Sequence, residues 1–244
     1  SERIIVHSGR APRVVGSNPT WVLSNHDVAR HATRYGLPDD VDSRAWLPVG
    51  PHEGLDVERG ARRARAAAMI TLGLPGSAYV YQGDELGLPE VWDLPTDVLQ
   101  DPVWHDSGHT AKGRDGCRVP IPWEPTGPSF GFGDGPGWLP QPASFGALAA
   151  SAQEDDPESS LALYRTALAI RRDHLVDEDG FAMIDWGPDV LAFRRGRLTC
   201  VANMGERPVP LPGGDVMLAS SELADRELPP DTAAWLTAPA EGAS

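Results

Sequence analysis

The chain has 244 residues, 41% of them hydrophobic, which is enough apolar material for one large domain or two small ones. Its formal net charge of −14 argues against nucleic acid or an anionic membrane surface as a partner. No apolar run approaches the roughly 20 residues of a membrane span. The two cysteines, Cys117 and Cys200, lie in different predicted regions, which favours reduced thiols in a cytoplasmic protein. No histidine or cysteine cluster has metal-ligand spacing, so we expect neither a metal nor a cofactor.

The first informative run is an apolar stretch from Trp21 that ends abruptly in Asn25-His26-Asp27. Trp, Val and Leu favour a buried strand. A carboxylate and an imidazole at the C-terminal tip of such a strand are well placed for chemistry in a parallel α/β barrel. The alternative is a helix cap, since Asn25 and Asp27 are both good N-cap residues.

A second run of the same design follows. Residues 57–72 predict a helix rich in Ala and Arg, which Gly73 and Pro75 end. A turn then leads into a short aromatic strand around Tyr79, and this strand ends in Gln82-Gly83-Asp84-Glu85. Strand, helix and strand with polar residues at both tips is the βαβ pattern of a parallel sheet.

The segment from Pro89 to about Pro142 is dense in Pro, Gly and Trp and has little periodicity. Loops of that length are either functional or disordered. The aromatic residues in this one favour a packed, functional loop, because disordered segments are poor in aromatics. Two helices are expected after it, over 145–153 and 158–174.

The remainder of the chain changes period. Short strand-like runs separated by turn residues predict a small antiparallel β-sandwich. The expected strands are 181–185, 190–194, 198–203, 209–211, 216–220 and 233–236.

Three of these segments together resemble a known family. Residues 21–27, 79–87 and 113–123 are similar to three consecutive landmarks of the α-amylase superfamily, in its α-glucosidase and oligo-1,6-glucosidase branch. The resemblance implies that the two strands are the seventh and eighth of a (β/α)8 barrel. Residues 1–176 would be the C-terminal part of that catalytic barrel, with the active-site loop at about 89–142, and 177–244 the C-terminal β-sandwich domain.

The resemblance also implies which parts lie elsewhere. In the family, the nucleophilic Asp and the acid/base Glu follow the fourth and fifth strands, which would precede Ser1. We therefore expect a partner, the N-terminal half of the barrel, as a companion chain or a cleaved remainder. A second partner would be an α-glucoside oligosaccharide.

Site roles follow residue by residue from the same resemblance. Asp27 matches the family's third carboxylate, which binds the 2- and 3-hydroxyls of the sugar at the cleavage site and stabilises its charged transition state. His26 matches a second hydroxyl ligand, although a lone histidine is more often structural. Arg114 matches the arginine that pairs with an N-terminal-half Asp and holds the non-reducing-end glucose, and Arg118 is the competing choice for this role. For both arginines the alternative is a surface ion pair.

Trp123 could stack on a sugar in the next subsite, or it could simply pack its own loop. Arg30 and Arg34 are expected to brace the loop after the first strand. Asp84 and Glu85 are expected to anchor the barrel rim by hydrogen bonds.

The resulting expectation is a retaining α-glucosidase-like hydrolase that removes terminal α-linked glucose from short oligosaccharides, with this chain inactive by itself. Alternatives are a transglycosylase or a trehalose-forming isomerase of the same superfamily, and a non-catalytic, barrel-derived carbohydrate-binding subunit. A further alternative places all the chemistry in this chain, with Asp27 and Glu85 as the catalytic pair.

Overall fold

The computed structural model describes residues 19–42, 54–175 and 180–237. Contacts divide the chain into two compact units. The sheet unit comprises the described parts of Ser1–Val22, Arg65–Tyr79 and Leu163–Ser244, and the loop unit comprises those of Leu23–Ala64 and Val80–Ala162. Helices α3 (Val57–Gly73) and α6 (Ser160–His174) contribute residues to both units.

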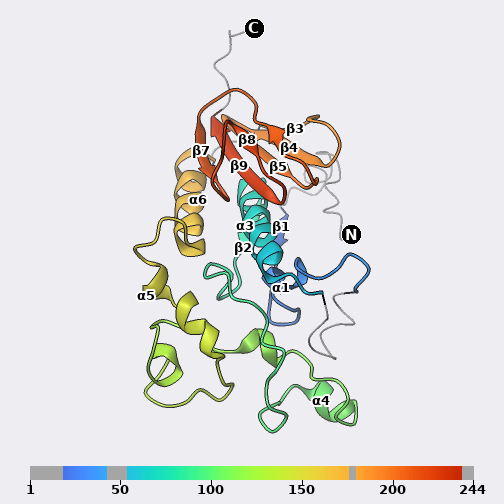
Figure 1. The fold of residues 1–244 in the computed structure, drawn as a ribbon, viewed down its shortest axis with the longest axis vertical. Coiled ribbons are helices and arrows are strands. Elements are labelled where there is room, and N and C mark those ends of the chain that lie inside the picture. Colours follow the sequence, from blue (N-terminus) through green and yellow to red (C-terminus); the bar gives the residue numbers. More distant parts are fainter. Residues whose placement is uncertain (1–18, 43–53, 176–179, 238–244) are drawn as a thin grey trace. The chain divides into compact units, whose positions relative to one another are not determined.

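The predicted βαβ unit is present. Strand β1 (Thr20–Val22) pairs in parallel with β2 (Ser77–Tyr79), with Trp21 opposite Ala78, and α3 connects them (Figure 1). The Trp21 indole donates a hydrogen bond to Pro75 O at 2.7 Å. Both strands are shorter than the apolar runs that predicted them. At the end of β1, the carbonyl of Leu23 accepts a hydrogen bond from the Arg34 guanidinium instead of continuing a ladder.

The C-terminal region is the predicted antiparallel β structure. Five strands form one sheet in the order β3 (Phe181–Ile184), β4 (Val190–Arg195), β5 (Leu198–Asn203), β9 (Thr232–Thr237) and β7 (Val216–Ala219). A second, two-stranded sheet pairs β6 (Val209–Pro210) with β8 (Glu227–Leu228). The sequence did not predict β8, because its two residues carry no alternation and follow a turn in which Asp225 and Arg226 both have positive φ.

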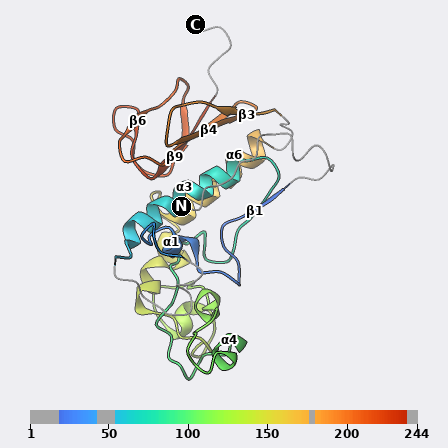
Figure 2. The same cartoon turned by 90° about the vertical axis from the view of Figure 1, so that its right-hand side faces the viewer.

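The parts of α3 and α6 that belong to the sheet unit lie beneath the five-stranded sheet (Figure 2). Trp235 of β9 is fully buried, and its indole donates to Met69 O of α3 at 3.1 Å. Gly73 ends α3 where a Cβ would lie 3.0 Å from the Phe193 ring. The helix therefore packs closely because its last residue has no side chain.

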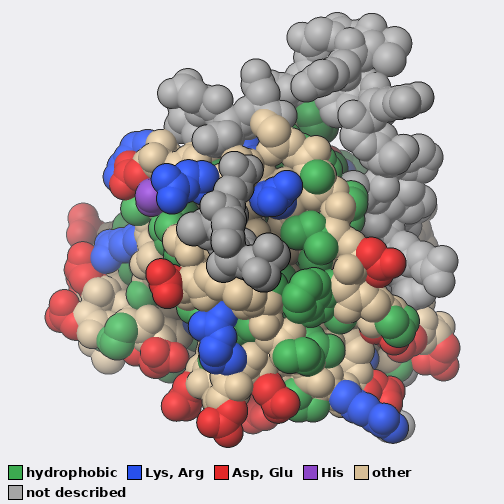
Figure 3. Space-filling model, turned by 90° about the horizontal axis from the view of Figure 1, so that it is seen from above, with side chains coloured by type: hydrophobic (Ala, Val, Ile, Leu, Met, Phe, Trp, Pro, Cys, Tyr) green, Lys and Arg blue, Asp and Glu red, His purple; other side chains and the backbone are tan. Residues whose placement is uncertain are grey.

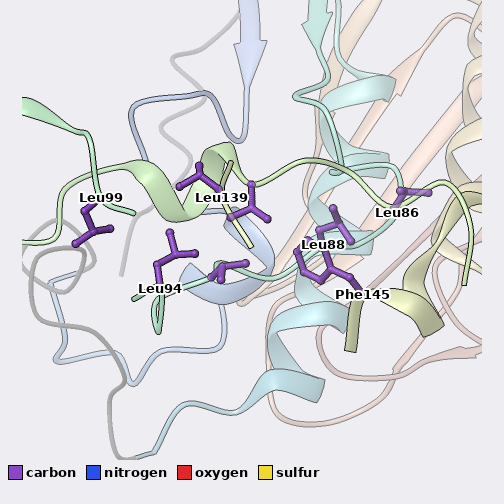
Figure 4. Packing of buried hydrophobic residues seen from close by; sticks show 8 residues of the cluster. Leu86, Leu88, Leu94, Leu99, Leu139 and Phe145 are labelled. Carbon is purple, nitrogen blue, oxygen red and sulfur yellow. The ribbon is translucent and has the colours of Figure 1, made fainter. Parts of the chain in front are cut away.

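The long segment after β2 is packed around its own core. Eight buried residues form this core, from the chain just after β2 and from the loop that follows (Figure 4). They are Leu86, Leu88, Val91, Leu94, Leu99, Val119, Leu139 and Phe145. This agrees with the prediction of a packed loop.

Short helices punctuate the loop unit. They are α1 (His31–Arg34), α4 (Pro102–Asp106), α5 (Ala150–Gln153), and the 3-10 turns η2 (Asp115–Arg118), η3 (Pro128–Gly131) and η4 (Ala143–Leu148). The single helix predicted over 145–153 was wrong. Ala149 is extended (φ −61°, ψ 149°), and the next amide, Ala150 N–H, donates to Pro122 O at 3.1 Å. A tertiary hydrogen bond thus replaces the helical one and splits the segment.

On the face seen in Figure 3, acidic side chains are spread toward the edges, with basic and hydrophobic ones among them. The negative charge is therefore not gathered into one patch on that face. Among the described residues, no helix combines the length and apolar character that crossing a bilayer requires.

Candidate active-site segment around Asp27

The segment that follows β1 forms a tight turn. The Asp27 N–H donates to Asn25 Oδ1 at 2.8 Å, which is an Asx turn. The next helix, α1, has Arg30 as its N-cap and no side-chain cap, so neither Asn25 nor Asp27 caps it. The carboxylate of Asp27 is 49% exposed and therefore open to solvent.

Four of the five side chains predicted for the site lie together. His26 Nε2 is 3.2 Å from Asp27 Oδ2, and Arg114 Nη1 donates to Asp27 Oδ1 at 2.7 Å. Arg118 Nη2 lies 3.6 Å from the same oxygen, and its Nε donates to His26 O at 3.1 Å. We call His26, Asp27, Arg114 and Arg118 the Asp27 cluster. Because two guanidinium groups and an imidazole surround one carboxylate, the cluster is suited to binding sugar hydroxyls, which both donate and accept hydrogen bonds.

Trp123 is not part of this cluster. Its backbone N–H donates to Phe130 O at 2.8 Å within its own loop, and its side chain is 50% exposed. No hydrogen bond or ion pair of the described residues connects it to the Asp27 cluster. Both alternatives for Trp123, sugar stacking and loop packing, remain predictions.

Two buried carboxylates that were not predicted from the sequence hold the cluster in place: Asp101 binds Arg114, and Asp115 binds the backbone of Asp101. Asp101 is buried and accepts hydrogen bonds from Arg114 Nε at 2.5 Å and Nη2 at 3.0 Å. Asp115, also buried, accepts from the backbone N–H groups of Gln100 and Asp101. The Arg114 guanidinium holds the pKa of Asp101 well below its usual range. An Asp followed by Pro is typical of a helix start, and Asp101 does cap α4 by accepting Val103 N–H. The sequence has no pattern that indicates the contact of Asp101 with Arg114.

The predicted bracing by Arg30 and Arg34 is present in the loop unit. Arg30 is fully buried, and its guanidinium donates to Gln82 O at 2.7 Å and Cys117 O at 3.0 Å. Arg34 Nε donates to Ala29 O at 2.9 Å. Arg30 thereby connects three stretches of chain: the turn after β1, the end of the second apolar run, and η2, which Arg114 precedes and Arg118 ends.

Glu90 closes the same buried network. Its Oε2 accepts the backbone N–H of Arg30 at 2.9 Å. Burial raises the pKa of Glu90 to about 7, against the opposing effect of this hydrogen bond and of the nearby Arg30 and Arg34 charges. The group therefore titrates close to neutral pH.

Asp84 and Glu85 bind their own turn, as expected of rim anchors. Asp84 Oδ2 accepts Tyr81 N–H at 3.3 Å, and Glu85 Oε2 accepts Gly83 N–H at 2.8 Å. Burial raises the pKa of Glu85. Its carboxylate is thus engaged by its own loop, which gives no support to a catalytic pair formed with Asp27.

A buried Ser, His and Asp also meet in this unit. Ser24 Oγ is 2.7 Å from His31 Nδ1, and Asp84 Oδ1 is 3.4 Å from that same nitrogen. A nucleophilic triad needs its serine and its carboxylate on opposite nitrogens of the imidazole. This arrangement therefore holds the turn after β1 in place and does not activate Ser24.

Comparison with known proteins shows the family of the chain. Residues 11–179 match the family described as alpha amylase, catalytic domain, and residues 182–235 match a domain of unknown function, DUF3459. The chain is 34% identical over 191 residues to a probable alpha-glucosidase of Rhizobium meliloti, covering 76% of this chain and 31% of that protein. It is 26% identical over 172 residues to a probable oligo-1,6-glucosidase of Bacillus subtilis, covering 64% of this chain and 27% of that protein.

Solved structures give the same result. The alpha-glucosyl transfer enzyme XgtA aligns with a TM-score of 0.66 at 33% identity, over 90% of this chain and 40% of that one. Trehalulose synthase MutB aligns with a TM-score of 0.67 over 89% of this chain and 43% of that one, and at 23% identity this likeness shows the fold alone.

The chain spans about a third of the length of the curated relatives it matches. The predicted fold class is confirmed: strands β1 and β2 belong to the C-terminal part of the family's barrel, and an antiparallel β domain follows. Because the catalytic-domain match covers well over half of the chain, the chain belongs to the alpha-amylase family of glycoside hydrolases and their transglycosylating relatives.

Proposed function

We propose that this chain is the substrate-binding, transition-state-stabilising part of a retaining α-glucosidase-like hydrolase that acts on the terminal α-linked glucose of short oligosaccharides. The observation that carries the proposal is the solvent-open carboxylate of Asp27 directly after a barrel strand, in contact with Arg114 at 2.7 Å and His26 at 3.2 Å. The names of the relatives, alpha-glucosidase and oligo-1,6-glucosidase, support this substrate class.

The role of Asp27 follows from what the reaction requires. A retaining glycosidase uses a nucleophilic carboxylate and an acid/base carboxyl about 5–5.5 Å apart. Asp27 would be neither, and would instead accept hydrogen bonds from the 2- and 3-hydroxyls of the sugar. Those bonds strengthen as the ring becomes positively charged, so they favour the transition state over the bound substrate.

Asp27 has room for such bonds while it keeps its protein partners. A carboxylate offers about four acceptor sites. Arg114 donates to Oδ1 at 2.7 Å and His26 lies 3.2 Å from Oδ2, whereas Arg118, at 3.6 Å from Oδ1, is too far away for a hydrogen bond. The remaining sites are available to sugar hydroxyls, because the side chain is half exposed.

The N-terminal half of the barrel would supply the nucleophile and the acid/base residue, either as a companion chain or as the other part of one longer protein. Without it, the chain has only the third carboxylate of the catalytic set. We therefore propose that residues 1–244 alone do not hydrolyse α-glucosides.

Transglycosylation is the second candidate. It is favoured by the 33% identity to an alpha-glucosyl transfer enzyme over 90% of this chain. Hydrolysis and transfer share a covalent glycosyl-enzyme intermediate, which either water or a sugar hydroxyl can attack. Residues on the acceptor side of the pocket would determine whether water or a sugar hydroxyl attacks.

The test is Asp27→Asn in the complete enzyme. This change keeps the size of the side chain and removes its charge, so kcat should fall by about 100-fold or more while KM changes much less. Asp106→Asn, at the exposed end of α4, serves as the matched control and should leave both constants unchanged. If Asp27→Asn raised KM alone, Asp27 would bind substrate without stabilising the transition state.

A further inference from the structure

We propose that Asp101 is a positioning residue that fixes the Arg114 guanidinium in the direction of Asp27. Arg114 is a candidate substrate contact under the proposed function, and the consequence for catalysis rests on that function. The positioning itself rests only on the geometry of the described residues.

The side chain of Asp101 is completely buried and saturated with hydrogen bonds. Its Oδ2 accepts from Arg114 Nε at 2.5 Å and from the Arg114 backbone N–H at 2.8 Å. Its Oδ1 accepts from Arg114 Nη2 at 3.0 Å and from Val103 N–H at 3.1 Å. Three of these four bonds come from one residue, so Asp101 holds both ends of Arg114.

Because the guanidinium is planar, its hydrogen bonds to Asp101 also fix its orientation. Nε and Nη2 form one edge of a planar fork, and a carboxylate that binds this edge by two parallel hydrogen bonds fixes the plane of the fork. The remaining nitrogen, Nη1, then points away from Asp101. In the structure it donates to Asp27 Oδ1 at 2.7 Å.

The neighbours of Arg114 are adapted to the same contact. Gly113 has φ +76°, and a Cβ there would lie 2.7 Å from the Cβ and Cγ of Asp101. Asp115 Oδ2 accepts the backbone N–H of Asp101 at 2.9 Å. Residues 113–115 therefore approach Asp101 as a unit, and only glycine fits at 113.

This arrangement is more than a surface ion pair. The Arg114 side chain is 35% exposed, and a free arginine of that exposure would sample many rotamers at a large entropic cost on binding. Asp101 restricts that freedom before any substrate arrives. It does so without touching the substrate, because it is buried beneath Arg114.

The first test uses wild-type chain 1–244 labelled with nitrogen-15, and follows the exchange of arginine Nε–H protons by NMR. The Arg114 signal is assigned by its loss in Arg114→Lys. It should exchange about tenfold more slowly than that of the exposed Arg62, because it is held by a buried carboxylate. Equal exchange rates would overturn the proposal without any variant of Asp101.

The second test is Asp101→Asn, with Asp106→Asn as the control. Asn has one acceptor oxygen, so it can keep either the Val103 and Nη2 bonds or the two bonds at the other oxygen. In either orientation the charged, two-point contact with the guanidinium is lost, so Arg114 Nε–H should exchange faster in Asp101→Asn than in wild type, and at the wild-type rate in Asp106→Asn. Retained protection in Asp101→Asn would contradict the proposal.

Kinetics in the complete enzyme separate positioning from general stability. Asp101→Asn should raise KM about tenfold with kcat nearly unchanged, and it should have little further effect in an Arg114→Lys background, where the fork is absent. An equal loss in both backgrounds would mean that Asp101 acts through folding alone. If the NMR results held but KM did not move, the positioning would stand and the binding role of Arg114 in the proposed function would fail.

Discussion

At the scale of single residues, the two carboxylates that contact Arg114, Asp27 and Asp101, each have a guanidinium partner. Asp27 contacts Arg114 and Arg118, and Asp101 contacts Arg114. Asp101 supplies the largest of the influences that raise the pKa of Arg114 above its usual value, and Asp27 supplies a smaller one. The cluster is thus anchored by the buried Asp101 and open to solvent at Asp27.

Arg114→Ala tests the exposed end. The contact of Arg114 with substrate would already exist before reaction, so the change should raise KM for short substrates about tenfold and weaken the preference for chain ends, with a smaller effect on kcat. Steady-state kinetics on a disaccharide and a longer oligosaccharide would measure both effects. Arg118→Ala, whose guanidinium is 3.6 Å from Asp27, should have the smaller effect. The reverse order would transfer the role to Arg118.

Glu90→Gln tests the buried network through pH. The pKa of Glu90 is about 7 in the folded chain against a reference of 4.5, so between these values the folded state holds a proton that the unfolded state has released. Stability from this group is therefore lost as pH rises from about 4.5 to 7, by up to about 3 kcal/mol. The glutamine variant lacks this loss and keeps an acceptor for Arg30 N–H.

The measurement is the thermal midpoint at pH 5 and pH 8. Relative to wild type, Glu90→Gln should gain stability as pH rises. The exposed Glu158→Gln is the matched control and should track wild type. Parallel curves for Glu90→Gln and wild type would show that Glu90 is ionised in the folded chain.

The sequence predicted the residues that contact Asp27 but not the buried carboxylate that supports them. Asp27 and His26 follow an apolar run whose end is visible in the sequence, and the structure places both in one cluster. Asp101 lies 13 residues from its partner Arg114 in a segment without periodicity. Its buried partnership depends on tertiary packing, which leaves no local pattern to read.

At the scale of elements, the bounds of helices and strands were predicted accurately where the sequence has regular periodicity. They were predicted wrongly where tertiary contacts decide the structure. The helix predicted over 57–72 is observed as Val57–Gly73, and the strand predicted over 198–203 is observed as Leu198–Asn203. The helix predicted over 145–153 failed because tertiary hydrogen bonds from Ala150 and Ser151 outweighed its local preference. Local propensity decides only where packing makes no competing demand.

Gly60 of α3 gives a test at this scale. In a helix interior, glycine to alanine normally stabilises by about 1 kcal/mol. Here a Cβ would lie 2.1 Å from Ala32 O, which is backbone and cannot move aside like a flexible side chain. We therefore expect Gly60→Ala to destabilise by about 1–3 kcal/mol. Urea midpoints would measure this, with the exposed Arg62→Ala in the same helix as control. A raised midpoint for Gly60→Ala would show that the two segments are not in close contact.

At the scale of the whole molecule, the chain contains part of the family's barrel. Within the described residues, β1 and β2 pair only with each other, and Val22 and Tyr79 are each 46% exposed. In a closed barrel every strand pairs on both sides, so further strands would cover the unpaired sides of β1 and β2. This is consistent with a chain that spans about a third of its relatives' length and supports the proposal that an N-terminal half completes the enzyme.

The most direct test of this account is complementation. Purified chain 1–244 and a separately produced N-terminal half, carrying the barrel's first six strands, are assayed alone and together for hydrolysis of p-nitrophenyl α-glucoside. Each should be inactive alone, the mixture should turn over substrate, and that turnover should fall by about 100-fold when this chain carries Asp27→Asn. Turnover by chain 1–244 alone that survives Asp27→Asn would contradict the account.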